Sequence, residues 1–303
     1  MSSNPTVSIL INNYNYGQFL AAAIDSAINQ TYDNVEIIVV DDGSTDNSQA
    51  VIADYGSKII PVLKKNGGQA SAFNMGFARS RGEIICFLDA DDVFVPHKIA
   101  EVVRVFTAYP EAGWCFHPLE FVDRHLQSLN IEQQYTGESG VYDITDDLKK
   151  GKLRGKLPFH SVATSGLCYR RSLLAKILPM PESIKITSDD YLKYSAFALA
   201  PGYALLKKLA WQTIHDNNAY TFRKDKQELR AKIDITTAYL LREKIPAIKK
   251  FTNNIFAIGL GIQQQLPKQE REVMLLIEKY YSSLQPLEKL EVNLRAFYYR
   301  YKK

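Results

Sequence analysis

Ile84-Ile85-Cys86-Phe87-Leu88-Asp89-Ala90-Asp91-Asp92 is the stretch of sequence that decides the fold. Its five apolar residues predict a strand that is buried on both faces, and the acidic residues behind them mark the strand's end. Residues 35–40 repeat the pattern, because this apolar run stops at Asp41-Asp42-Gly43-Ser44. Strands with two buried faces are typical of parallel sheets covered by helices, so the sequence predicts an α/β fold.

Outward from these two strands, strand patterns and helical patterns alternate four times between residues 7 and 88. The alternation predicts a mostly parallel, Rossmann-like sheet with helices on both faces. In such sheets ligands bind outside the carboxyl ends of the strands, so we expect the chemistry at the polar clusters 12–15, 41–42 and 89–92. The expected strands are 7–11, 35–40, 59–63 and 84–88, and the expected helices are 20–28, 46–55 and 70–79.

The end of the chain has a different character. After about residue 110 the pattern is less regular, and residues 273–284 and 287–301 each carry a helical stripe of apolar side chains. Gly259-Leu260-Gly261 and Pro267 are expected to separate helices. Residues 221–303 hold 17 Lys and Arg against 9 Asp and Glu, a net charge of +8, whereas the whole chain carries +4. We therefore expect a first domain over residues 1–220 and a helical C-terminal subdomain over residues 221–303.

The composition places the chain among globular proteins. With 46% hydrophobic and 23% charged residues it is neither disordered nor fibrous. No apolar run reaches the roughly 18 residues of a spanning helix, and residues 1–5 lack the basic start and apolar core of a secretory signal. Cys86, Cys115 and Cys168 lie far apart among apolar residues and are predicted to be buried free thiols of a reducing compartment. These features predict a cytoplasmic protein.

Several nucleotide-binding and catalytic motifs are excluded. Gly259-Leu260-Gly261 has no third glycine and follows no strand, so it is not a dinucleotide fingerprint. Gly151 to Lys156 is one residue too short for a phosphate-binding P-loop. No serine lies in a nucleophile elbow, and the five histidines lack zinc spacing. The sequence therefore does not support a dehydrogenase, an NTPase or a serine hydrolase.

The acidic cluster Asp89-Ala90-Asp91-Asp92 is the most informative of the polar clusters. Carboxylates placed directly after a strand raise each other's pKa unless a cation or a hydrogen-bond donor compensates. Mg²⁺ and Mn²⁺ take oxygen ligands and commonly bridge carboxylates to substrate phosphates. The alternative at this point is a solvated turn in which one Asp caps the helix that begins near Pro96.

Asp41-Asp42-Gly43-Ser44-Thr45-Asp46 ends the second predicted strand. A turn followed by a helix N-cap accounts for Gly43 and Asp46. It leaves Asp42 unexplained, and this carboxylate could accept hydrogen bonds from the N–H edge of a base. Lys64 and Lys65, at the end of the third strand, are expected to be solvated, and the alternative is that one of them adds positive charge at the site.

Seven stretches of the chain occur in an order and spacing that resemble a known family. They are residues 7–15, Gln30-Thr31-Tyr32, residues 35–46, residues 66–76, residues 82–92, Ser188-Asp189-Asp190 and Ile214-His215-Asp216-Asn217-Asn218. Together they resemble family-2 glycosyltransferases, which are inverting enzymes with the nucleotide-diphospho-sugar-binding fold called GT-A. The resemblance covers roughly residues 5–220 and implies a GT-A-type fold with its site at the strand ends.

The resemblance implies roles for residues that follow the first two strands. Tyr14 resembles the family residue that stacks on the nucleotide base, and Asp42 resembles the residue that reads the uracil N–H, which favours a UDP-sugar donor. A different interpretation of Tyr14, an aromatic side chain buried under the following helix, stays open. The further nucleotide-sugar-binding positions that the resemblance implies are Asn13, Gly68, Asn74 and Asp89.

The resemblance also implies a divalent cofactor, Mn²⁺ or Mg²⁺. Asp91 resembles the direct metal ligand of the family's Asp-x-Asp motif, and Asp89 resembles the carboxylate on the ribose or metal side. His215 resembles the family histidine near the diphosphate and the metal, and its alternative is a histidine on an apolar face. The metal would neutralise the charge that develops on the departing diphosphate.

Asp190 resembles the family's catalytic base, which takes the proton from the acceptor hydroxyl on the face opposite the leaving group. Asp189 stands where the family usually has glutamate, so the catalytic assignment covers both Asp190 and Asp189. The alternative is that the two acids lie at a helix N-terminus, where the macrodipole favours negative charge.

The resemblance as a whole implies a metal-dependent inverting glycosyltransferase of hexosyltransferase type. It would move one sugar from a nucleoside-diphosphate sugar to a glycan or lipid-linked acceptor, in polysaccharide, cell-envelope glycan or glycolipid synthesis. A processive synthase is not expected, because the sequence has no Gln-x-x-Arg-Trp motif. A catalytically silent nucleotide-binding module of the same fold is the alternative, and a nucleotidyltransferase is a third reading, although its glycine-rich start is missing.

Basic and aromatic residues are interleaved in Arg295-Ala296-Phe297-Tyr298-Tyr299-Arg300-Tyr301-Lys302-Lys303. A helix of this kind suits an anionic membrane surface, so peripheral contact with the inner membrane face is one interpretation. The other is a packing helix that buries its stripe against the first domain or a second subunit, as in a homodimer. Nucleic-acid binding is not expected, because residues 1–220 carry a net charge of −4.

Overall fold

The computed structural model describes residues 4–131, 136–153, 157–160, 162–185, 187–216, 218, 223, 225–267 and 270–301. The chain forms two compact units. The first comprises Met1–Asp143, Pro158–Leu192 and Leu199–Asn217, and the second comprises Ile144–Leu157, Lys193–Ala198 and Asn218–Lys303. The expected domain boundary between residues 220 and 221, Asn217 of the last motif, and Lys302 and Lys303 of the basic end lie outside the described residues.

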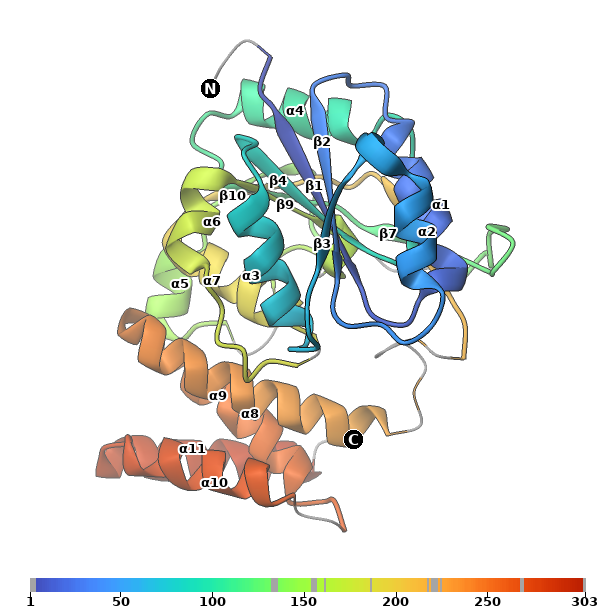
Figure 1. Ribbon diagram of the computed structural model, residues 1–303. Coiled ribbons are helices and arrows are strands. Elements are labelled where there is room, and N and C mark those ends of the chain that lie inside the picture. The colour runs from blue at the N-terminus through green and yellow to red at the C-terminus, as the bar shows by residue number, and fades with distance from the viewer. Residues whose placement is uncertain are drawn as a thin grey trace. The chain divides into compact units, whose positions relative to one another are not determined.

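Among the described residues, eight strands form the main sheet of the first unit, in the order β3-β2-β1-β4-β9-β6-β10-β8. Figure 1 labels its parallel part, β3, β2, β1 and β4. The first four are parallel to one another and β10 is parallel to β6, whereas β9 and β8 run antiparallel to their neighbours. The predicted mostly parallel sheet is therefore confirmed. The strands are β1 (Val7–Asn13), β2 (Val35–Asp41), β3 (Ile60–Leu63), β4 (Ile84–Asp89), β6 (Trp114–Phe116), β8 (Gly140–Tyr142), β9 (Leu167–Arg170) and β10 (Gly202–Ala204).

Helices cover both faces of this sheet, as predicted. Residues of α1, α2 and α4 join one buried cluster with Ile9 of β1. On the other face α3 packs Phe73 against Phe87 of β4, with ring centroids 4.4 Å apart. The helices are α1 (Gly17–Ile28), α2 (Ser48–Asp54), α3 (Gln69–Arg79), α4 (Lys98–Ala108) and α6 (Arg171–Ile177), with the 3-10 helices η1 (Gly56–Lys58) and η2 (Thr164–Gly166); α7 (Asp189–Leu199) has residues in both units.

A second, three-stranded sheet follows β4 directly. It consists of β5 (Asp92–Phe94), β11 (Ala210–Thr213) and β7 (Leu119–Val122), with β11 in the middle. Because β11 pairs antiparallel with β5, the residues after β11 return to the start of β5. The small sheet therefore brings residues near 215 to the carboxyl end of β4.

The three cysteines are buried as free thiols, as predicted, but they are not far apart in the fold. Cys168 on β9 is the register partner of Cys86 on β4 and of Cys115 on β6. The three thiols therefore stand in one row across three neighbouring strands, a relationship that their sequence spacing does not reveal.

The second unit is helical, which confirms the expected helical C-terminal region. Its core includes Phe256 and Tyr280, whose rings stack with centroids 3.8 Å apart. Within the described ranges, none of the helices is both long and apolar enough to cross a bilayer. The helices are α5 (Thr145–Lys150), α8 (Lys226–Lys244), η3 (Pro246–Ile248), α9 (Lys249–Gln263), α10 (Arg271–Ser282) and α11 (Pro286–Tyr301).

The expectation that Gly259-Leu260-Gly261 separates helices is wrong, because these residues lie inside α9. A Cβ on Gly259 would come within 3.0 Å of the Ala231 carbonyl oxygen on α8. A Cβ on Gly261 would come within 2.7 Å of the Ala296 carbonyl oxygen on α11. The glycines are present because α8 and α11 approach the backbone of α9 closely, which requires residues without a side chain.

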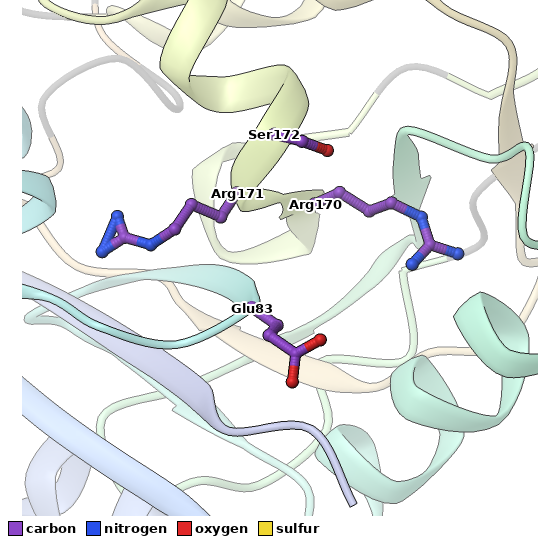
Figure 2. A pocket seen from close by; sticks show the side chains of 4 residues that line it. All are labelled: Glu83, Arg170, Arg171 and Ser172. Atoms are coloured by element: carbon purple, nitrogen blue, oxygen red, sulfur yellow. The ribbon is translucent and has the colours of Figure 1, made fainter. Parts of the chain in front are cut away.

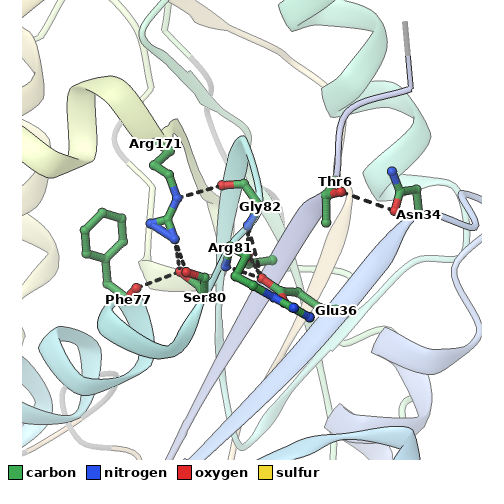
Figure 3. Close-up of polar contacts among 9 residues, drawn as sticks. Thr6, Asn34, Glu36, Phe77, Ser80, Arg81, Gly82 and Arg171 are labelled. Carbon is green, nitrogen blue, oxygen red and sulfur yellow. Dashed lines mark hydrogen bonds and ion pairs between the residues drawn. The ribbon is translucent and has the colours of Figure 1, made fainter. Parts of the chain in front are cut away.

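Glu36 on β2 fixes the turn that precedes β4, at the amino end of the sheet (Figure 3). Its carboxylate accepts hydrogen bonds from Ser8 Oγ at 2.6 Å, from Gly82 N at 3.0 Å and from Arg81 N. Burial opposes ionisation, but these hydrogen bonds outweigh it and hold the pKa of Glu36 below its usual value. Arg171 adds a hydrogen bond from its guanidinium to the Gly82 carbonyl oxygen at 3.0 Å.

A pocket of about 370 Å³ lies at the same end of the sheet, lined by Glu83, Arg170, Arg171 and Ser172. The two arginine side chains extend away from each other (Figure 2). Both guanidinium groups donate to backbone carbonyl oxygens, Arg170 to Ala112 and Arg171 to Gly82. Because Glu83 precedes β4, this pocket lies at the opposite end of β4 from the polar cluster that follows the strand. The hydrogen bonds of Arg170 and Arg171 to backbone carbonyl oxygens give these side chains structural roles.

Candidate active site

The polar clusters that follow β1, β2 and β4 meet at one edge of the main sheet. Asn12 of β1 is the register partner of Asp89 of β4, and its Nδ2 donates to Asp89 Oδ1 at 2.9 Å. Asn13 is the register partner of Asp41, and its Nδ2 donates to Asp41 Oδ1 at 2.8 Å. The three clusters that the sequence predicted to lie together are therefore joined by direct hydrogen bonds.

Asp42 organises the loop that precedes α3. Its buried carboxylate accepts hydrogen bonds from Gly67 N at 2.9 Å and from Gly68 N at 2.7 Å, and it forms an ion pair with Lys64. Gly68 has a φ of 88°, a value that favours glycine. The expectation that Lys64 is solvated is wrong, since its side chain is only 14% exposed in this ion pair. A carboxylate has about four acceptor positions, so these three bonds leave room for one more donor.

Asn13 and Tyr14 lie at the end of β1 with opposite exposure. Asn13 is buried, its Nδ2 also donates to Ser44 Oγ at 3.1 Å, and its Oδ1 has no hydrogen-bond partner among the described residues. Tyr14 is 47% exposed. The interpretation in which the following helix covers the Tyr14 ring is therefore wrong. The end of β1 offers one exposed aromatic ring and one buried, unused acceptor.

Ser165, in η2 just before β9, is hydrogen-bonded to two residues of the acidic cluster 89–92. Its Oγ donates to Asp92 Oδ2 at 2.6 Å and accepts from the backbone N–H of Asp89 at 3.0 Å. Lys98, buried on α4, donates to the Ser165 carbonyl oxygen at 2.7 Å. Burial, followed by the charges of Asp91 and Asp89, raises the pKa of Asp92 well above its usual range.

The solvated-turn alternative for this cluster is wrong for Asp92, which is buried. It also fails as an account of α4, because the helix begins at Lys98 with no side-chain hydrogen bond at its N-cap residue, His97. An Asp of the cluster therefore does not cap this helix.

Negative charge is concentrated around Asp89. Burial, and then the charges of Asp91 and Asp189, raise the pKa of Asp89 to about 8. Asp91 is partly buried, and its Oδ2 lies 3.1 Å from Nε2 of His215. The His215 ring stacks on Phe19 with ring centroids 4.4 Å apart. Two aspartates and one histidine thus come from the end of β4 and the end of β11.

The donor set at this edge fits a divalent cation that is shared with a substrate. Among the described residues, no three Asp, Glu, His or Cys side chains form a group arranged to hold a metal by themselves. Mg²⁺ and similar ions are usually held by one or two carboxylates together with substrate phosphates, so a complete protein cage is not needed. Asp91 and Asp89 are carboxylates of this kind, and His215 lies next to Asp91.

Gln69 connects the acidic cluster to the start of α7. Its Nε2 donates to Asp89 Oδ1 at 3.4 Å, and its Oε1 accepts from Ser188 N at 2.9 Å and from Ser188 Oγ at 2.8 Å. Asp189 and Asp190 follow in the first turn of α7, where the macrodipole favours acids. Asp190 is buried, and the charge of Asp189 acts on Asp89. The structure therefore brings the last acidic motif to the edge that carries the first three.

Asn74 is bound at both ends of its amide to the backbone of Met180. Its Nδ2 donates to the Met180 carbonyl oxygen at 2.8 Å, and its Oδ1 accepts from Met180 N at 2.7 Å. These two bonds hold α3 against the segment that leads to α7, so Asn74 has a positioning role in this structure.

Sequence reasoning missed the supporting roles of Lys98, Ser165 and Gln69. A signal existed for Lys98, since it precedes Val102 and Val105 by four and seven residues and therefore lies on the buried face of α4. Ser165 and Gln69 carry no such periodic signal, because their partners are distant in sequence.

One family model and several known proteins match this chain in sequence. The family model described as Glycosyl transferase family 2 matches residues 8–178. An uncharacterised glycosyltransferase of Nostoc sp. is 36% identical over 244 residues, which cover 77% of this chain and 74% of that protein. The minor teichoic acid biosynthesis protein GgaB of Bacillus subtilis is 27% identical over 214 residues, which cover 68% of this chain and 23% of GgaB.

A solved structure shares the fold. S. aureus TarS 1-349 in complex with UDP-GlcNAc matches with a TM-score of 0.63 and 19% identity, covering 97% of this chain and 89% of that chain. TarS 1-349 has also been solved in complex with UDP. At this level of identity the match establishes the architecture, and it agrees with the expected GT-A-type fold.

Proposed function

Because the chain belongs to glycosyl transferase family 2 and is a glycosyltransferase, we propose that it moves one sugar from a UDP-sugar to an acceptor hydroxyl, with inversion. The main support for the proposal is that Asp42, Asp89 and Asp91 lie at one edge of the main sheet, next to the acidic first turn of α7. The choice of UDP is supported by the nucleotide in the TarS complexes. Residues 1–220 would form the catalytic domain, and residues 221–303 would form the helical subdomain.

In this proposal the end of β1 and the Asp42 loop bind the nucleotide. The exposed Tyr14 ring is available to stack on the base, an interaction that contributes about 1–3 kcal/mol. Asp42 has an acceptor position left after its three bonds, and Asn13 Oδ1 has no partner among the described residues. Either acceptor can take the N–H of a uracil ring. Gly68 lets the loop backbone donate to Asp42 in a conformation that other residues adopt poorly.

Asp91 and Asp89 would hold Mn²⁺ or Mg²⁺, with His215 beside Asp91. When bound, the ion supplies positive charge that stabilises the departing diphosphate. The concentration of acids that raises the pKa of Asp89 to about 8 supports this assignment, because a cation would relieve the repulsion among them. The Asp91–His215 contact at 3.1 Å would hold the Asp91 carboxylate in one orientation.

Asp190 is the proposed catalytic base. Its carboxylate would accept the proton of the acceptor hydroxyl while the acceptor oxygen bonds to the anomeric carbon, and the bond between that carbon and the diphosphate oxygen breaks to release UDP. Successive residues of a helix point about 100° apart, so Asp190 and Asp189 face different directions. The charge of Asp189 acts on Asp89, so Asp189 stays the second candidate, and the choice of Asp190 rests on its match to the second acid of the family's pair.

The acceptor we propose is a glycan or a lipid-linked glycan of the cell envelope. The support for this class is that one relative, GgaB, is a minor teichoic acid biosynthesis protein.

The proposal is tested by incubating the chain with UDP-GlcNAc, UDP-glucose and UDP-galactose, with Mn²⁺, Mg²⁺ or a chelator, and measuring released UDP. At least one donor should be turned over, and the chelator should abolish turnover. Asp190→Asn should keep donor binding and lose about 10²–10⁴-fold in rate, the usual contribution of a positioned base. Asp33→Asn, at an exposed position away from these residues, is the matched control.

Two outcomes would contradict parts of the proposal. Full turnover by the Asp190→Asn variant would move the base to Asp189. Donor binding without turnover, whichever acceptor is supplied, would favour the catalytically silent module.

A further inference from the structure

The last helix, α11, has two apolar faces, and only one of them is packed. Val292 and Ala296 are buried, and the close approach at Gly261 fixes this side of the helix to α9. The other side carries six large side chains whose exposed fractions range from 57% to 82%. We call these six residues the α11 stripe: Leu287, Leu290, Leu294, Phe297, Tyr298 and Tyr301.

The spacing of the α11 stripe is that of a single helix face. Its members follow one another at intervals of three, four, three, one and three residues, which keeps them within about 100° of the helix circumference. The buried pair, Val292 and Ala296, lies on the opposite side of the wheel. Scattered exposed apolar residues are normal, but a contiguous patch of six large apolar side chains marks an interaction surface.

The two borders of the α11 stripe differ in charge. By helical spacing Arg300 and, farther round, Lys289 lie beyond Phe297, whereas Glu291 lies directly beyond Tyr298. Lys289 and Arg300 are exposed on α11. The two acids of this helix are already paired, Glu288 with Arg242 at 3.0 Å and Glu291 with Arg295. The surrounding sequence, residues 221–303, carries a net charge of +8. An apolar face with exposed basic residues along one border, and with its acids already paired, is compatible with helices that lie in the interface of an anionic membrane.

We propose that the α11 stripe docks on a bilayer that contains anionic phospholipids. The leucines and Phe297 would enter the boundary between head groups and acyl chains, Tyr298 and Tyr301 would lie at head-group level, and Lys289 and Arg300 would contact phosphates. This inference rests on the second unit alone and is independent of the proposed donor and base.

A second copy of the chain fits the same stripe less well. In a helix pair with Leu287, Leu294 and Tyr301 at the central positions, the flanking residues would be Glu291 and Tyr298 on one side and Asn293 and Arg300 on the other. These flanks supply no set of opposite charges for either a parallel or an antiparallel pair, whereas coiled coils use such charges to choose their partner. The net charge of +8 also repels an identical surface.

The test is co-sedimentation of the full chain with vesicles of phosphatidylcholine alone and of phosphatidylcholine with about 30% phosphatidylserine. We expect binding to the anionic vesicles, little binding to the neutral ones, and a loss of at least about tenfold in Leu290→Ser/Leu294→Ser/Phe297→Ser. Lys289→Gln/Arg300→Gln keeps the stripe and should weaken binding several-fold, as should raised salt. The matched control is Leu129→Ser/Ile131→Ser, which removes two exposed apolar residues from the first unit.

The variants are compared by circular dichroism, so that loss of binding is separated from loss of folding. Sedimentation equilibrium without vesicles gives the molar mass. Equal vesicle binding by the wild-type chain and the folded triple variant, or no binding by the wild type, would overturn the proposal. A wild-type dimer that the triple variant dissociates would assign the α11 stripe to a second copy instead.

Discussion

Nε2 of His215 lies 3.1 Å from Oδ2 of Asp91, although 124 residues separate the two in sequence. The antiparallel pairing of β11 with β5 creates this contact, because Asp91 precedes β5 and His215 follows β11. Phe19 supports the His215 ring from α1. The small sheet therefore completes a cluster whose other members come from the end of β4.

His215→Ala should weaken the dependence of donor binding on Mn²⁺ by about 10–100-fold, the usual effect of removing a side chain that orients a metal ligand. Titration of Mn²⁺ at constant UDP-sugar, followed by calorimetry, measures the change. His125→Ala, at an exposed position, should leave the titration unaltered. An unchanged titration in the His215 variant would remove it from the proposed metal site.

Asp91→Asn should abolish metal-dependent donor binding while the chain stays folded. The substitution keeps the size of the side chain but removes the charge that a divalent cation requires. Its thermal unfolding temperature, measured with UDP and Mn²⁺, should no longer rise on adding the pair. A full ligand-induced rise in this variant would contradict the metal assignment of Asp91.

Ser165→Ala should lower the free energy of unfolding by about 1–3 kcal/mol and also reduce turnover. The change removes the hydroxyl that donates to the buried Asp92 and accepts from Asp89 N, so two buried polar groups lose a partner. Urea unfolding and UDP release from the same preparations measure both effects. Ser282→Ala, on the exposed surface of α10, is the control and should change neither.

Glu36→Gln should destabilise the chain at neutral pH and much less in acid. The folded-state pKa of Glu36 lies below the usual 4.5, so its contribution is present above that pH and is lost as the pH falls through the folded-state value. Urea unfolding at about pH 7 and about pH 3.5 should therefore show a difference from wild type of about 1–3 kcal/mol that shrinks at the lower pH. Glu111→Gln, at an exposed position, should show no such pH dependence. An equal loss at both pH values would mean that shape, and not charge, makes Glu36 important.

Gly261→Ala should destabilise the second unit although alanine is the better helix former. The gain in helix propensity is about 1 kcal/mol, whereas the new Cβ would come within 2.7 Å of the Ala296 carbonyl oxygen, and overpacking of this kind costs about 1–3 kcal/mol. Thermal unfolding followed by circular dichroism measures the balance. A Cβ at Gly140 meets nothing within 4 Å, so Gly140→Ala is the matched control. A more stable Gly261 variant would show that α11 can move away from α9 at little cost.

The first hundred residues could be interpreted from sequence because their strands are continuous apolar runs that end abruptly in polar residues. Each of the four predicted strands overlaps an observed one. The fourth was predicted to end at Leu88, one residue before the observed end of β4 at Asp89. The short strand β5, at residues 92–94, was not foreseen. After residue 110 the strands have only three or four residues, too few for a period of two to stand out, and β7 and β11 were not foreseen either.

The residues of the candidate site likewise fall into a group that the sequence located and a group that it did not. Asp42 and Asp89 could be located because they follow strands, and the ends of parallel strands meet at one edge. The ion pair of Lys64 with Asp42 and the bond of Ser165 to Asp92 could not, because the loop and the antiparallel strand that create them leave no repeat in the sequence. His215 was assigned by resemblance alone, and only the pairing of β11 with β5 explains why it lies beside Asp91.

The row of Cys86, Cys168 and Cys115 provides a way to measure how fast the main sheet opens, by thiol labelling. A thiolate must reach solvent before an alkylating reagent can modify it, and these three stand at one level of adjoining central strands. Exposing one of them to a bulky maleimide requires separating strands that also shield the other two. When the reagent is concentrated enough for labelling to outpace refolding, mass spectrometry should therefore record molecules with no adduct or with three, and the triply labelled species should appear at the rate of global unfolding.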